Sequence, residues 1–111
     1  MRTLRLLNLY CNRTDNNNTE SNETFLSVEN GTFHIFGPKL MINGNNWNIN
    51  TDINFNEQAI IGLFDEDLIR NLSTTKQFRN YIVEENEVHE RPKTINFATN
   101  TANYVLTYEI I

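Results

Sequence analysis

The stretch 46-NWNINTDINFN-56 carries the most regular pattern in this chain of 111 residues. Its odd-numbered positions are apolar or β-branched, and its even-numbered positions are asparagine or aspartate. Side chains of a β-strand alternate between the two faces of a sheet, so this period of two predicts a long, half-buried strand. The asparagine side has two interpretations, a solvated sheet face or a surface that binds a sugar or another polar ligand. Antiparallel sheets routinely leave one face wet, which favours the first.

Strand-like segments continue on both sides of this stretch. The run 58-QAIIGLF-64 is continuously apolar, which predicts a central strand. Asn30-Gly31 predicts a type I′ hairpin turn, because both residues tolerate positive φ. Pro38 is expected to separate the segments 32–37 and 39–42. The second of these leads into another Asn-Gly turn at residues 43 and 44. Further strands are expected at 3–11, 25–28, 32–37, 39–42, 78–83, 93–98 and 103–110.

These segments predict an all-β fold. Only residues 65–90 could hold a helix, and their apolar positions recur too irregularly for more than one short turn. Seven or eight short strands without alternating helices predict a single antiparallel β-sandwich. A chain of this length is expected to form one domain over residues 1–111.

Composition excludes several classes of function. A net charge of −5 and a pI near 4.9 argue against binding to nucleic acid or to anionic membranes, which require clustered Lys and Arg. Cys11 is the only cysteine, so no intramolecular disulfide can form, and a buried position is expected for it. No apolar run is long enough for a membrane-spanning helix, and the opening residues lack a signal-peptide cleavage site. We therefore expect a soluble protein without a signal peptide, and its compartment stays open.

Catalytic chemistry is not evident in the chain. Its two histidines, His34 and His89, lie in a strand pattern and in a charged loop, where a packed or solvated role is expected. No zinc-ligand spacing, phosphate-binding glycine loop or dinucleotide fingerprint is present. The sequence predicts that the protein is not an enzyme.

Two acidic segments could bind a hard cation. Asp65, Glu66 and Asp67 follow the apolar run 58–64, and an earlier polar loop holds Asp15, Asn17, Glu20, Asn22 and Glu23. Calcium takes oxygen ligands from carboxylates and amides on such loops. The acidic triplet is a cation site if the two loops converge, and a solvated turn if they do not.

The order of these features resembles a C2-like β-sandwich, the calcium-dependent lipid-binding module first defined in protein kinase C, and its shorter bacterial relatives. The resemblance rests on 4-LRLLNLYC-11, the Asp15 loop, 22-NETFLSV-28 and 60-IIGLFDED-67, and it covers about the first 70 residues. It implies a calcium cofactor, with Asp15, Asp65 and Asp67 as ligands and Asn22 or Glu23 at a further ligand position.

The sequence departs from the family pattern in two places. Asn22 stands where an aspartate is expected, and 68-LIRNLS-73 lacks the further acidic residue that completes the second loop. Fewer carboxylates imply weaker calcium binding or none.

Two classes of function stay open. The first is a non-enzymatic binding module, with or without calcium, whose partner is a protein, a glycan or a membrane. The second is a structural or toxin-associated accessory subunit that forms homo-oligomers through its sheet edges without metal.

Overall fold

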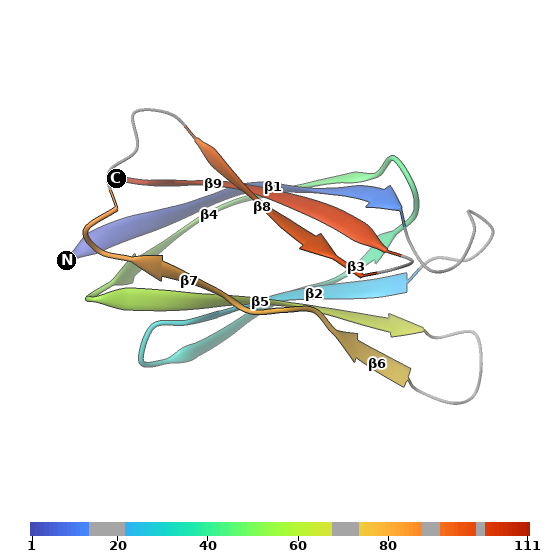
Figure 1. Ribbon diagram of the computed structural model, residues 1–111, viewed down its shortest axis with the longest axis horizontal. Coiled ribbons are helices and arrows are strands. Elements are labelled where there is room, and N and C mark those ends of the chain that lie inside the picture. Colours follow the sequence, from blue (N-terminus) through green and yellow to red (C-terminus); the bar gives the residue numbers. More distant parts are fainter. Residues whose placement is uncertain (14–21, 68–73, 88–91, 100–101) are drawn as a thin grey trace.

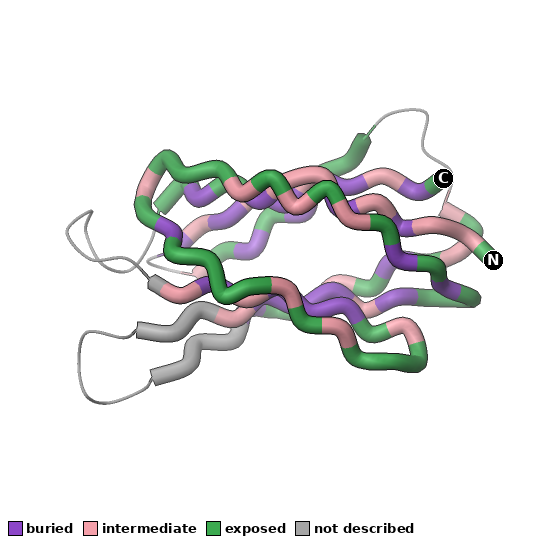
Figure 2. The backbone as a smooth tube through the Cα atoms, turned by 180° about the vertical axis from the view of Figure 1, so that it is seen from behind, coloured by how far each residue is buried: buried purple, intermediate pink, exposed green. Residues whose placement is uncertain are grey.

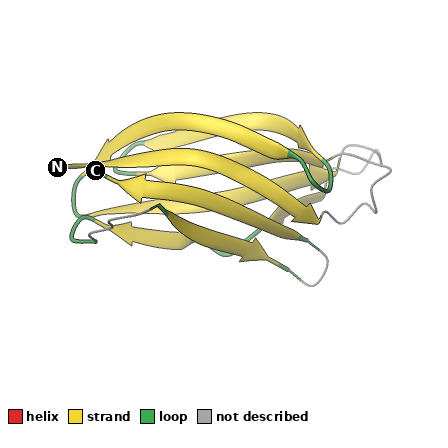
Figure 3. Ribbon diagram, turned by 90° about the horizontal axis from the view of Figure 1, so that it is seen from above, coloured by secondary structure: helices red, strands yellow, loops and turns green. Residues whose placement is uncertain are grey.

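Nine strands and no helix form the described part of the chain, as the computed structural model in Figure 1 and Figure 3 shows. The structure describes residues 1–13, 22–67, 74–87, 92–99 and 102–111, and in residues 22, 65–67 and 74–77 it describes the backbone alone. No helix in these residues is long and apolar enough to cross a membrane. The strands are β1 (Arg2–Arg13), β2 (Asn22–Glu29), β3 (Phe33–Met41), β4 (Asn46–Phe55), β5 (Gln58–Asp67), β6 (Thr74–Gln77), β7 (Tyr81–Glu84), β8 (Lys93–Ala98) and β9 (Asn103–Ile110).

The strands form two antiparallel sheets that face each other. One sheet has the order β4-β1-β9-β8, and the other has the order β3-β2-β5, followed by β6 and β7 on the remaining edge of β5. β7 pairs with the first half of β5 and β6 pairs with its last residues, so the two short strands together occupy one position in the sheet. The predicted antiparallel β-sandwich is confirmed.

The alternation that predicted β4 holds in the structure. Ile53 and Phe55 are buried, and Trp47 and Ile49 pack against the core. The asparagines at 46, 48 and 54 and Asp52 are exposed on the opposite face. Buried residues alternate with less buried ones along β9, and in β1 the alternation shifts between Leu6 and Leu9, where the pairing with β4 is irregular. Figure 2 shows buried and less buried segments following one another along the strands. The first sheet therefore has one apolar and one polar face.

Both sheets contribute large apolar side chains to the space between them. Tyr104, Phe55 and Phe97 come from the first sheet, and Leu26 and Leu63 come from the second. Cys11 is also buried in this core, as expected. Burial of apolar surface stabilises the fold by about 25 cal/mol per Å², so this layer dominates the stability of the sandwich.

The hairpin between β2 and β3 is confirmed, but its predicted turn type is wrong. Of Asn30 and Gly31, only Gly31 has a positive φ, of 102°, whereas a type I′ turn needs two such residues. The Asn30 side chain stabilises the turn instead, since its Oδ1 accepts a hydrogen bond from the backbone N–H of Thr32 at 3.1 Å. This is the local asparagine-to-backbone bond that favours turns.

The predicted interruption at Pro38 is wrong, because β3 runs through it from Phe33 to Met41. β3 is an edge strand, where proline removes no hydrogen bond from the sheet, and the pairing with β2 shifts register at this point. Gly37 has a φ of 105°, and a Cβ there would lie 2.7 Å from the backbone oxygen of Thr24. Glycine thus lets the irregular edge approach β2 closely.

The second sheet also differs from the prediction around β5 and its two short partner strands. β5 extends beyond Phe64 to Asp67, because β2 pairs with one of its edges and β6 with the other. β6 was not expected, since 74-TTKQ-77 has no apolar residue. The expected strand at 78–83 becomes β7 at Tyr81–Glu84, preceded by a buried Phe78.

Candidate functional site

The backbone brings part of the predicted cation ligands to one end of the second sheet. In the pairing of β2 with β5, Glu23 lies opposite Glu66 and Thr24 lies opposite Asp65. Asp67 is opposite Thr74 of β6. The start of β2 and the end of β5 are therefore neighbours, as convergence of the two acidic segments requires.

The ligand geometry itself lies outside the described residues. Asp15 belongs to a segment that the structure does not describe, and for Asn22, Asp65 and Asp67 it describes the backbone only. The Glu23 side chain is half-buried. Among the described side chains, no group of three or more His, Cys, Asp or Glu residues could hold a metal ion. The predicted calcium ligands thus stay a prediction.

A second candidate site lies on the outer face of the β3-β2-β5-β7 sheet. Ile35 of β3 lies opposite Ser27 of β2, which lies opposite Gly62 of β5. Leu26 and Leu63, one position along each central strand, point into the core and are fully buried. The alternate positions therefore face away from the other sheet. The apolar residues at these positions, here called the apolar outer face, are Phe25, Phe33, Ile35, Leu40, Ile60, Phe64 and Ile82.

The exposure of these residues is unusual for their size. Phe33 is 56% exposed, Ile35 59%, Leu40 55% and Ile82 57%, while Phe25 is half-buried. Single exposed apolar residues are common on protein surfaces, but a contiguous group of them marks an interaction surface. All described strands belong to the two sheets, so no described strand is packed over this group.

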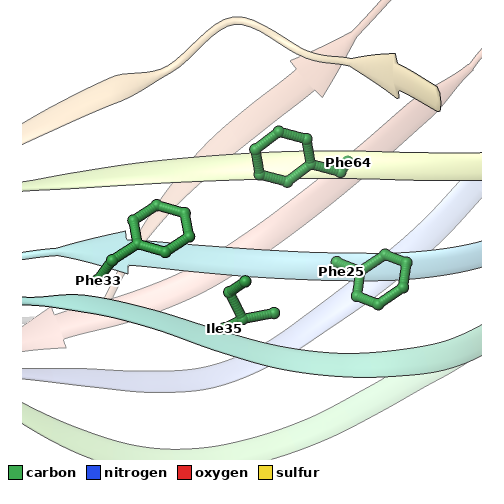
Figure 4. Close-up of a pocket in the computed structure, with 4 residues that line it drawn as sticks. All are labelled: Phe25, Phe33, Ile35 and Phe64. Carbon is green, nitrogen blue, oxygen red and sulfur yellow. The ribbon is translucent and has the colours of Figure 1, made fainter.

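A shallow groove runs across the apolar outer face. Phe25, Phe33, Ile35 and Phe64 line it, and its volume is about 240 Å³. Figure 4 shows these four side chains on the near side of the second sheet, with strands of the first sheet behind them. Its lining has no polar surface, so it can contribute apolar contacts only.

Two small, buried residues lie in the middle of the apolar outer face. Ser27 and Gly62 are opposite each other on β2 and β5, between the row of Phe25 and Phe64 and the row that contains Phe33. A Cβ on Gly62 would lie 2.7 Å from Ser27 Oγ and 2.9 Å from Asn80 Oδ1. Position 62 therefore has no room for a larger side chain unless Ser27 or Asn80 shifts.

The charged residues described on this face are all acidic. Glu29 lies between Phe33 and Ile60 in one row of cross-strand partners, and it is exposed. Glu84 lies opposite Gln58 at the same end, and Glu23 lies opposite Leu40 at the other end. The apolar middle is thus flanked by carboxylates at both ends of the strands.

The outer face of the first sheet has a different character. Its polar side chains bond to one another: Asn8 Nδ2 donates to Asn46 Oδ1 at 2.8 Å, and Arg5 pairs with Asp52 at 2.8 Å. This hydrogen bond from Arg5 lowers the pKa of the Asp52 carboxyl from its ordinary value of 3.8. The two outer faces therefore differ, one polar and internally bonded, the other apolar.

Comparison with known proteins gives the fold a name. No family profile matches this chain, and no curated protein sequence does. A solved structure of Drosophila C2-DSL-EGF1 matches 98% of the chain with a TM-score of 0.52 and 11% identity. The fold is C2-like. A human GIVD cytosolic phospholipase A2, solved with methyl γ-linolenyl fluorophosphonate and terbium chloride, also matches 98% of it, with a TM-score of 0.54 and 11% identity.

The C2-like resemblance read from the sequence is confirmed at the level of the fold. The chain spans 66% of the Drosophila chain and 17% of the phospholipase chain, so neither protein's activity follows for it. At 11% identity the likeness shows the C2-like architecture and no specific family.

Sequence reasoning missed the apolar outer face, although a signal for it exists. The run 58-QAIIGLF-64 and the segments 25-FLSV-28 and 32-TFHIFG-37 carry apolar residues at consecutive positions, so both faces of their strands are apolar. Such runs indicate a sheet that is covered on both sides. Here the core covers one side only, and Phe33, Ile35 and Ile82 are exposed on the other.

Proposed function

We propose that this chain is a non-enzymatic binding module that recognises a protein partner with its apolar outer face. The observation that carries the proposal is the exposure of Phe33, Ile35, Leu40 and Ile82 on one sheet face. Burying each such side chain at an interface is worth about 1.5–3 kcal/mol relative to leaving it in water.

The chemistry of the groove favours a macromolecule over a small metabolite. Pockets for small molecules are usually about 300–1,000 Å³ and contain a few polar groups that fix the ligand's orientation. This groove is smaller and open to solvent, and Phe25, Phe33, Ile35 and Phe64 line it without polar surface. Large apolar side chains of a partner fit it better.

A displayed library of random peptides, selected against the folded chain, tests the proposal. Selected peptides are then added to isotope-labelled protein, and backbone amide shifts are mapped by NMR. We expect the shifts to centre on Phe25, Phe33, Ile35 and Phe64. The Ile35→Asp variant should lose binding, because a carboxylate placed under an apolar ligand is desolvated without a partner.

Asn48→Asp is the matched control, since it also adds a carboxylate at an exposed position, on the outer face of the other sheet. It should bind the selected peptides as the parent does. The proposal is wrong if no peptide is enriched over the Ile35→Asp variant. It is also wrong if the shifts centre on the asparagine-rich face.

Calcium binding at the end of the second sheet is a second, separate proposal. It is supported by the register that sets Glu23 opposite Glu66 and Thr24 opposite Asp65. The proposed ligands are Asp15, Asp65 and Asp67, with Asn22 or Glu23 as a further oxygen donor. Calcium that binds only the folded state would raise the melting temperature.

Calorimetry with calcium, after removal of bound metal by a chelator, tests this second proposal. We expect heat of binding and a rise in melting temperature, both abolished in the Asp65→Asn plus Asp67→Asn variant. Glu109→Gln, on the outer face of the first sheet, is the control that should keep both effects. Absence of heat and of a thermal shift in the parent chain would refute calcium binding.

A further inference from the structure

We infer that the partner segment is apolar in its middle and carries lysine or arginine at its ends. The inference rests on the proposed function, since it names the partner class for the same surface. It is drawn from the positions of three glutamates around the groove.

Glu29 is a charged residue within the apolar outer face. It is exposed in the free chain and sits between Phe33 and Ile60, two residues of the apolar outer face. A partner that covers these two residues must also take water away from the Glu29 carboxylate. A desolvated carboxylate is costly unless a cation or several donors replace the water. The partner is therefore expected to bring a cation to this point.

The distance from Glu29 to Glu23 sets the expected spacing of the cations on the partner. Glu23 lies on the same face of the same strand as Glu29, opposite Leu40, six residues away along β2. Six residues of strand span about 20 Å. Cations that meet both carboxylates must therefore be about 20 Å apart, the length of a helix of about 13 residues. Glu84 adds a third carboxylate at the Glu29 end.

The same charges argue against two other occupants. A second copy of this chain, with a net charge of −5, would bring the same glutamates into an interface with no matching cations. An anionic membrane would be repelled, because membrane surfaces attract Lys and Arg, and the charged residues described on this face are Glu23, Glu29 and Glu84.

The test uses three synthetic amphipathic peptides of about 14 residues. All three share one face of leucines, and they carry at each end two lysines, two serines or two glutamates. Affinity for the whole chain is measured by fluorescence anisotropy. We expect the lysine peptide to bind about tenfold tighter than the serine peptide, and the glutamate peptide to bind weakest. The lysine advantage should shrink as sodium chloride rises from about 0.05 to about 0.5 M.

Neutralisation of single carboxylates locates the effect. In the Glu29→Gln variant the preference for lysine over serine should fall, while the affinity of the serine peptide stays the same or rises. Glu109→Gln removes a carboxylate from the outer face of the other sheet and should leave the preference unchanged. Both positions are at the surface, so folding of each variant is checked by its melting temperature.

The outcomes separate the inference from the proposed function. If the serine and lysine peptides bind equally, and Ile35→Asp abolishes both, the partner class is wrong and the binding surface stands. If none of the peptides binds, or Ile35→Asp has no effect on binding, both are wrong. Binding of the chain to phosphatidylserine vesicles through Phe33 and Ile35 would also overturn the partner class.

Discussion

At the scale of single residues, two small side chains meet in the middle of the second sheet and leave no room for larger ones. Ser27 and Gly62 are cross-strand partners, and the taller Phe25 and Phe64 stand in the next row. Local sequence does not show that Ser27 and Gly62 are neighbours, because they are far apart in the chain and only the pairing of β2 with β5 brings them together. The close packing at position 62 could not be predicted from local pattern for that reason.

Gly62→Ala should destabilise the fold. Its Cβ would lie 2.7 Å from Ser27 Oγ and 2.9 Å from Asn80 Oδ1. Both atoms are ends of side chains that can turn away, so the cost should be at the low end of overpacking, about 1 kcal/mol. Urea denaturation measures the change. In a Ser27→Ala background the nearer of the two contacting oxygens is gone, so the same substitution should cost less. An equal loss in both backgrounds would contradict the proposed contact.

The Arg5–Asp52 pair on the polar outer face should give a small, pH-dependent contribution to stability. Both side chains are more than 40% exposed, at 42% and 47%, so solvent and salt weaken the attraction. The hydrogen bond from Arg5 lowers the pKa of Asp52 in the folded state. The contribution of the Arg5–Asp52 pair to stability is therefore present at neutral pH. It is lost as the pH falls below 3.8, the ordinary pKa of an aspartate carboxyl, and Asp52 becomes protonated.

Urea midpoints of the Asp52→Asn variant test this between neutral and acidic pH. The variant should be slightly less stable than the parent chain at pH 7, and the difference should vanish in acid. In an Arg5→Gln background the aspartate substitution should have no such pH-dependent effect. A difference that persists unchanged at low pH would show that the ion pair is not its cause.

At the scale of elements, strands with strict alternation were predicted better than strands with continuous apolar runs. The alternation in 46–56 specified both faces of β4, and the structure confirms them. The run 58–64 predicted a central strand, and β5 is central, but the run does not say what covers each face. The strand through Pro38 and the extension of β5 to Asp67 depend on pairing with distant segments, which local sequence does not show.

The two faces of the second sheet should respond differently to truncation. Leu63→Ala in β5 removes a fully buried side chain, so it should lower the free energy of unfolding by about 2–5 kcal/mol. Ile35→Ala in β3 removes a side chain that is 59% exposed, so it should change stability by less than about 0.5 kcal/mol. Denaturant unfolding compares the two. A large loss for Ile35→Ala would mean that this residue serves folding and not binding.

At the scale of the whole molecule, the chain is a β-sandwich with one polar and one apolar outer face and a net charge of −5. The C2-like fold was read from the order of a few short segments, and the structure agrees. The calcium ligands carried over with that resemblance fall at the end of the second sheet, where Asp15 and the side chains of Asp65 and Asp67 are outside the described residues. The apolar outer face could be identified only from the strand pairing, which shows which residues lie on the same face of the second sheet.

Net charge should control self-association of this surface. At pH 7 the charge of −5 keeps copies apart, and near the pI of about 4.9 this repulsion disappears. Sedimentation velocity should show a monomer at pH 7 and association near the pI, reduced in the Phe33→Ser plus Ile35→Ser variant. A dimer at pH 7 that this variant breaks would make a second copy the partner. A dimer that survives it would favour the accessory subunit that assembles through its sheet edges.

The most direct test of the central claim is the affinity of the lysine-flanked peptide for two matched double variants. Phe33→Ser plus Ile35→Ser alters the apolar outer face, and Asn46→Ser plus Asn48→Ser alters the outer face of the other sheet. If the apolar outer face is the recognition surface, the first variant binds at least about tenfold more weakly and the second binds as the parent does. Equal affinity of the parent and the first variant would contradict the account.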